Sequence, residues 1–199
     1  MVNVALRRPA APPVVLALTL ALAAACWAVA AWLMNGMDMG VTAWVTMMAA
    51  MMLPGAAPAV ASYARIAGTA RAALLFAGVY LGFWALAGIM AYTLDRPHGA
   101  LAAGVVLIAA GDYELTPVKR HFRRRCRENS GSAIEYTLCC AGSSVGLMAA
   151  LVAVDVMSLF WMAVVTVIAT AQKLLPAKAA IDVPLALAIV GFGLVLVIQ

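Results

Sequence analysis

The side chains best suited to chemistry in this chain are the thioether sulfurs of a short methionine-rich stretch. It holds three methionines around one carboxylate: Met34, Met37, Asp38 and Met39. Thioether sulfur prefers a soft ion such as Cu(I) over hard ions such as Mg²⁺ or Ca²⁺. Gly36 favours a turn that can fold these side chains around one ion. The stretch therefore predicts a copper(I) site in a loop.

More methionines follow in the next apolar segment. Met47 pairs with Met51, and Met48 with Met52, at the four-residue spacing that stacks side chains on one helix face. Met47 and Met48 would lie nearest the loop and could receive an ion passed inward. The alternative is that methionine fills gaps between packed helices, where its flexible side chain adapts to irregular spaces.

The cysteines follow no disulfide framework, and we expect reduced thiols at Cys26, Cys126, Cys139 and Cys140. Cys139 and Cys140 are adjacent, so their side chains point about 100° apart on a helix and form a poor chelate alone. Cys126 stands among arginines, which predicts a lowered pKa for its thiol. Each of these cysteines can equally be a small buried residue.

The composition indicates that a lipid bilayer is the main solvent for these residues. Of the 199 residues, 66% are hydrophobic and 11% are charged. A transmembrane helix takes about 20 residues, which leaves no room for a separate soluble domain. We expect an all-α fold, a polytopic transmembrane bundle formed by residues 1–199 as one domain. Its predicted spans are 14–33, 41–63, 72–94, 100–116, 133–154, 157–175 and 183–198. The count is seven, and six is the alternative if the last two runs do not both span, because the junction at Asp155 between the fifth and sixth runs is tight.

The basic residues sit at every second junction between these spans. All lysines and arginines except Arg96 then fall on one side of the membrane, which the positive-inside rule assigns to the cytoplasm. The N-terminus and the loop from Lys119 to Arg127 are predicted to be cytoplasmic. The net charge of +5 is thereby explained by orientation, and nucleic acid is not expected as a partner.

Several motifs resemble a bacterial family of predicted metal-binding integral membrane proteins without an established function. They are, in order, Ala50-Met-Met-Leu-Pro54, Tyr113-Glu-Leu-Thr-Pro-Val-Lys119, Cys126-Arg127 and Lys173-Leu-Leu-Pro176. The resemblance implies a multi-pass protein of the bacterial cytoplasmic (inner) membrane. It also implies a soft-metal cysteine cluster, of which Cys126 and Cys140 are retained here.

Several family positions differ in this chain. Phe122 replaces a loop cysteine, Ser143, Ser144 and Val145 replace a Cys-Cys-Trp run, and Gln172 replaces a glutamate. We therefore expect Cys139 and Cys140 not to form an essential metal pair. The full set of candidate metal ligands is Met34, Met37, Asp38, Met39, Met47, Met48 and Cys140.

The chain carries no motif for nucleotide binding, zinc proteolysis or acyl transfer, so an enzyme is not expected. The leading hypothesis is a non-catalytic accessory or assembly subunit associated with copper, partnered by the bilayer and by other membrane subunits. One alternative is a purely structural subunit of a larger membrane complex. A small transporter is a further alternative, weakened by the scarcity of charges near span centres.

Overall fold

The computed structural model describes residues 13–35, 41–93, 99–128, 131–154, 158–175 and 182–198, and its secondary structure there is entirely helical. The helices are α1 (Pro13–Asn35), α2 (Val41–Ala67), α3 (Ala70–Thr93), α4 (Ala100–Leu115), α5 (Pro117–Glu128), α6 (Ala133–Val154), α7 (Leu159–Leu174) and α8 (Asp182–Ile198). The all-α prediction is confirmed. Each predicted apolar run coincides with one helix, whereas α5 was not predicted as a helix.

Within the described residues, four helices are long and apolar enough to cross a membrane: α1, α2, α3 and α6. The number is five if α4 and α5, which meet at an angle of 60°, count as one bent span. The apolar helices α7 and α8 are shorter. These helices are compatible with membrane insertion, and the count of seven spans remains a prediction.

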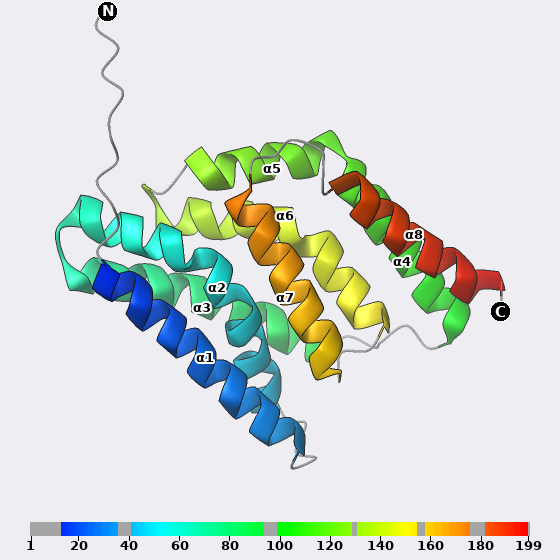
Figure 1. The fold of residues 1–199 in the computed structure, drawn as a ribbon, viewed down its shortest axis with the longest axis horizontal. Helices are drawn as coiled ribbons and strands as arrows, with labels where there is room; N and C mark the ends of the chain where they lie inside the picture. The colour runs from blue at the N-terminus through cyan, green and yellow to red at the C-terminus, as the bar shows by residue number, and fades with distance from the viewer. Residues whose placement is uncertain are drawn as a thin grey trace, which may run out of the picture.

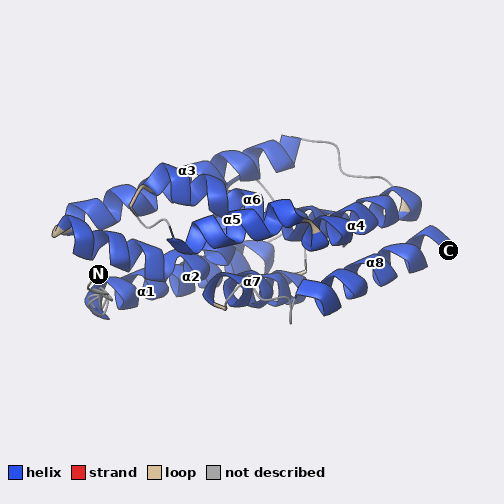
Figure 2. Ribbon diagram, turned by 90° about the horizontal axis from the view of Figure 1, so that it is seen from above, coloured by secondary structure: helices blue, strands red, loops and turns tan. Residues whose placement is uncertain are grey.

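Helix α2 is the centre of the bundle and packs against α1, α3 and α7 (Figure 1). Helix α4 packs most extensively on α8, and this pair contacts the rest of the bundle chiefly through α6. Figure 2 shows the α4–α8 pair at one end of the molecule and α1, α2 and α3 at the other. The main hydrophobic core therefore lies around α2, where Met47, Met48, Met51 and Met52 are all buried.

The bend between α4 and α5 follows from the sequence Thr116-Pro117. A residue before proline is pushed to an extended backbone, and Thr116 has φ −66° and ψ 147°. Pro117 then begins α5, a position where its missing N–H costs nothing. The Thr116 hydroxyl accepts a hydrogen bond from the Lys119 backbone N–H at 3.3 Å. The short helix α5 is thereby turned to lie along the N-terminal part of α6, near the end of α7 (Figure 1).

Glycines allow two close helix contacts. A Cβ at Gly104 on α4 would lie 2.7 Å from the backbone oxygen of Gly193 on α8, so the two helices meet backbone to backbone. On α6, a Cβ at Gly142 would lie 2.7 Å from the ring of Phe122 on α5. Gly78 and Gly82 of α3 have open space instead. Gly142 therefore has a close neighbour on another helix, whereas Gly78 and Gly82 have none among the described residues.

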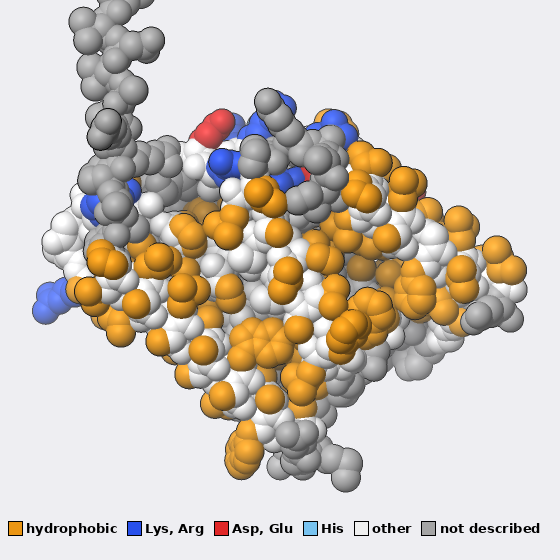
Figure 3. Space-filling model, viewed as in Figure 1, with side chains coloured by type: hydrophobic (Ala, Val, Ile, Leu, Met, Phe, Trp, Pro, Cys, Tyr) orange, Lys and Arg blue, Asp and Glu red, His pale blue; other side chains and the backbone are white. Residues whose placement is uncertain are grey.

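The surface separates apolar from basic side chains. In Figure 3 most Lys and Arg atoms lie along the edge formed by α5, above a face dominated by hydrophobic side chains. Large apolar residues are widely exposed, including Trp32 at 73%, Leu74 at 72% and Phe160 at 68%. A patch of this extent is typical of a surface that faces lipid or another protein.

Candidate functional site

The predicted loop ligands lie mostly outside the described residues: Met37, Asp38 and Met39 are not among them. Met34, at the end of α1, is half-buried and packs against the main core. Met47 and Met48 are buried in that core on α2. The proposed loop site therefore stays a prediction.

Cys140, the remaining predicted ligand, lies in a buried cluster of polar and sulfur-containing side chains. Its Sγ atom is 3.2 Å from the hydroxyl of Tyr80, which in turn lies 3.4 Å from the Nζ atom of Lys173. The same Nζ atom is 3.7 Å from the Sδ atom of Met52. Cys140, Tyr80 and Met52 are fully buried. The structure thus brings together α2, α3, α6 and α7 at one point.

Cys126 of α5 completes this cluster from the side of the basic helix. Its side chain interacts directly with that of Cys140. It also contacts the backbone oxygen of Tyr136, with a sulfur to oxygen distance of 3.8 Å. The interaction with Cys140, followed by burial, raises the pKa of the Cys126 thiol. The expected lowering by nearby arginines is therefore wrong, because the Cys126 side chain is buried against Cys140 and Tyr136 of α6.

Two tyrosines fix the walls of the cluster on the proline-containing part of α2. The Tyr80 hydroxyl is 3.2 Å from the Met52 carbonyl oxygen, and the Tyr136 hydroxyl donates to the Gly55 carbonyl oxygen at 3.3 Å. Pro54 and Pro58 lie nearby in α2 and lack the N–H that would donate to a preceding carbonyl. The two tyrosine hydroxyls bond carbonyl groups in the same segment of α2 as these prolines. They also hold Met52 in place.

A lysine crosses α2 at Gly55 to reach this cluster. A Cβ at Gly55 would lie 2.7 Å from Cδ of Lys173, so any larger residue would displace the lysine side chain. The ammonium group therefore already places a positive charge beside the Met52 sulfur and the Tyr80 hydroxyl.

The donor set determines which metal ions fit here. Within the described part of the chain, no three His, Cys, Asp or Glu side chains are grouped closely enough to hold a metal. A site with three side-chain ligands among these residues would therefore need methionine, and the sulfur atoms of the cluster belong to Met52, Cys126 and Cys140. Two thiols and one thioether suit Cu(I), while Mg²⁺ and Ca²⁺ require oxygen ligands. The ligand types of the cluster are therefore compatible with a copper(I) ion.

The contact between α5 and α6 also holds the positions where the resembling family has further cysteines. Phe122 lies against Gly142, and the Ser143 hydroxyl donates to the Cys140 carbonyl oxygen at 2.9 Å. Cys139 is buried, but no hydrogen bond joins its thiol to the cluster among the described residues. Of the adjacent cysteine pair, only Cys140 therefore belongs to the candidate site.

A network of buried charges holds α5 in the position that brings Cys126 to Cys140. Lys119 forms an ion pair with Glu114 of α4, and Arg123 forms one with Asp182 of α8. Gln172 of α7 links them: its amide nitrogen donates to Glu114 Oε2 at 2.9 Å and its Oε1 accepts from Lys119 at 3.0 Å. Lys119, Arg123 and Cys126 form the buried face of α5. The network therefore holds Cys126 in position next to Cys140.

The sequence did not predict that one site contains Met52, Tyr80, Cys126, Tyr136 and Lys173. A signal was nonetheless present. The separate motifs that carry the family resemblance supply Met52, Cys126 and Lys173, and the Tyr113–Lys119 motif supplies the Glu114–Lys119 pair. Motifs that are far apart in the chain meet at this cluster.

Comparison with known proteins gives one family match. The family model PpoB2, described as a copper chaperone, matches residues 41–196. No curated protein and no solved structure matches the chain. The matched range covers α2 to α7 and most of α8, and it includes every residue of the buried sulfur cluster.

Proposed function

Since the chain belongs to the PpoB2 family of copper chaperones, we propose that it holds Cu(I) as cargo between Met52, Cys126 and Cys140 and passes it to a partner protein. The observation that carries this proposal is the meeting of three sulfur-bearing side chains from α2, α5 and α6 beside the half-buried ammonium group of Lys173. In this role the chain is an accessory protein and performs no catalysis.

The chemistry of the cluster suits a chaperone. Cu(I) bound by two thiolates and a thioether can be exchanged with other thiols without a change in oxidation state. Cys126 sits on α5 at the polar edge of the bundle and lines a pocket, whereas Cys140 and Met52 are fully buried. An incoming thiol would meet Cys126 first. The ion would then move inward to Cys140 and Met52.

We further propose that the chain works within the bacterial cytoplasmic membrane, with α5 on the cytoplasmic side. The long apolar helices and their exposed apolar side chains support insertion. The basic residues of α5, together with Arg65, Arg71 and Lys173 at helix ends, support the orientation. The sulfur cluster would then open toward the cytoplasm, where thiols are kept reduced. Association with a larger membrane complex remains part of this proposal.

Copper retention by purified variants distinguishes the two cysteines of the cluster from the other cysteines of the chain. Purified in detergent under reducing conditions and loaded with Cu(I), the wild-type protein is expected to keep a stoichiometric amount of copper. Because changing an outer-shell partner alone costs 10- to 100-fold in metal affinity, losing the ligands in Cys126→Ser/Cys140→Ser should cost more than about 100-fold. Competition with a chromophoric Cu(I) chelator measures this affinity.

Two further variants provide controls for this experiment. Cys139→Ser removes a buried thiol outside the cluster and should bind copper like the wild type. Replacement of Met34, Met37 and Met39 by leucine tests the predicted loop site separately. Unchanged affinity in the double serine variant, together with copper loss in the triple leucine variant, would place the cargo in the loop and contradict this proposal.

A further inference from the structure

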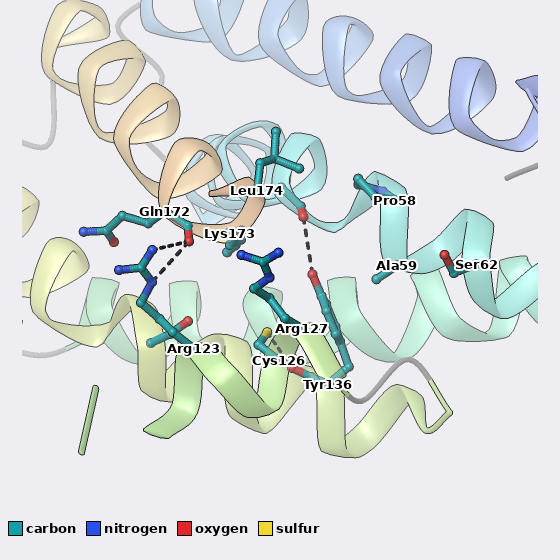
Figure 4. A pocket seen from close by; sticks show the side chains of 12 residues that line it. Pro58, Ala59, Ser62, Arg123, Cys126, Arg127, Tyr136, Gln172, Lys173 and Leu174 are labelled. Atoms are coloured by element: carbon teal, nitrogen blue, oxygen red, sulfur yellow. Dashed lines mark hydrogen bonds between the residues drawn. The ribbon is translucent and has the colours of Figure 1, made fainter. Parts of the chain in front are cut away.

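A polar pocket of about 200 Å³ opens beside the sulfur cluster at the α5 edge of the bundle (Figure 4). Its walls come from α2, α5, α6 and α7. Cys126 lines it, together with Tyr136 and Ser143. A ligand in this pocket would therefore contact the outermost thiol of the proposed copper site.

The charge of the pocket is positive. Its charged lining residues are Arg123, Arg127 and Lys173, and no acidic side chain lines it within the described part of the chain. Arg123 is paired with Asp182. Neither Arg127 nor Lys173 has an ion pair with a carboxylate among the described residues. In Figure 4 the guanidinium group of Arg127 projects from α5 into the pocket. The pocket therefore favours an anion.

The ligand must also be small and able to approach Cys126. The volume suits a molecule the size of a short peptide, and Ser62 and Ser143 add polar side chains to the walls. Guanidinium groups recognise carboxylates with paired hydrogen bonds. A carrier that combines carboxylates with a thiol could dock through Arg127 and Lys173 while its sulfur faces Cys126.

We propose that this pocket binds the carboxylates of a small anionic thiol that delivers Cu(I), an inference that rests on the proposed copper function. In the transfer step the bond between Cu(I) and the carrier sulfur breaks, and a bond between Cu(I) and Cys126 Sγ forms. The proton of the Cys126 thiol passes to the departing carrier thiolate. Copper remains Cu(I), so the step needs no oxidant or reductant.

Two carriers with the same thiol separate docking from copper binding. Glutathione presents two carboxylates, whereas its diethyl ester presents none. Loaded with Cu(I), both are mixed with the purified full-length protein, and copper transfer is followed over time. For Arg127→Gln we expect transfer from glutathione to slow about tenfold, the factor that corresponds to ~1.4 kcal/mol. Transfer from the diethyl ester should be unchanged.

Arg124→Gln is the matched control, because Arg124 is exposed on the same helix and does not line the pocket. It should behave as the wild type with both carriers. Equal transfer rates from glutathione in the wild type and in Arg127→Gln would overturn the docking proposal while leaving the copper function intact. Failure of the wild type to take copper from either carrier would instead contradict the copper function.

Discussion

Replacing Asp182 with alanine is expected to destabilise the folded protein by about 3–5 kcal/mol, the cost of leaving a buried charge without its partner. Asp182 is 1% exposed and pairs with Arg123, which is 5% exposed. The guanidinium group does not lose its proton in proteins, so Arg123 stays charged after the substitution. The loss should therefore be nearly the same at about pH 7 and about pH 9.5. Unfolding in detergent, followed by tryptophan fluorescence, measures it.

The double variant Arg123→Met/Asp182→Leu tests the cause of this loss. An apolar pair of similar volume is often tolerated in place of a buried ion pair. Arg123 also donates two hydrogen bonds to the Gln172 carbonyl oxygen, at 3.1 and 2.7 Å. The double variant should therefore regain most of the stability that Asp182→Ala loses. It should remain somewhat less stable than the wild type, because the Gln172 carbonyl oxygen no longer accepts hydrogen bonds from residue 123. A double variant as unstable as Asp182→Ala would show that the unpaired charge is not the cause.

Replacing Glu114 with alanine should cost a similar amount near pH 7, but this cost should fall as the pH rises. Burial lowers the pKa of Lys119, and the interaction with Glu114 opposes that shift. Without Glu114 the pKa of Lys119 falls further below its ordinary value of 10.5. At pH values between the pKa of Lys119 in the folded protein and its higher pKa in the unfolded chain, the unfolded chain binds more protons than the folded protein. The free energy of unfolding of the variant therefore rises with pH in this range. The buried amine escapes the penalty by becoming neutral.

The measurement compares the free energy of unfolding of Glu114→Ala and wild type at about pH 7 and about pH 9.5. Glu114→Gln is the matched control, since it keeps the shape and a hydrogen-bonding group while removing the charge. The loss of stability in Glu114→Gln should depend on pH in the same way as the loss in Glu114→Ala. A deficit in Glu114→Ala that stays constant over this range, as predicted for Asp182→Ala, would contradict the account of Lys119.

Both substitutions also bear on function. Lys119, Arg123 and Cys126 lie on the same buried face of α5, at spacings of four and three residues. Loss of either ion pair should loosen α5 from α4 or α8 and thereby displace Cys126 from Cys140. Weaker copper retention is therefore expected in the single variants, including in molecules that remain folded.

The helical architecture was predictable because composition alone identifies apolar segments of sufficient length. The boundaries agree closely: the predicted span 41–63 lies within α2 (Val41–Ala67), and 133–154 equals α6. Helix α5 was not predicted, because half of its residues are arginine or lysine and such a run indicates a loop that fixes the orientation. The break at Thr116-Pro117 and the buried positions of Lys119, Arg123 and Cys126 indicate an amphipathic helix.

The candidate site was only partly predictable, because its contacts join residues far apart in the chain. Cys140 was identified, but its neighbours Tyr80 and Lys173 are 60 and 33 positions away. Spacing within one helix identified the methionine pairs of α2 without showing that Met52 lies beside Lys173, which also contacts Tyr80. The same limit applies to Gly104 and Gly193, whose contact between α4 and α8 no local pattern indicates.

The most direct test of the copper site is copper X-ray absorption spectroscopy of the loaded protein. The account predicts Cu(I) bound only by sulfur, with the ligands Met52, Cys126 and Cys140. Met52→Leu should remove one sulfur atom from the copper shell, whereas Cys139→Ser should leave the shell unchanged. A copper shell of nitrogen or oxygen atoms, or an unchanged sulfur shell in Met52→Leu, would contradict the assignment of this cluster as the copper site.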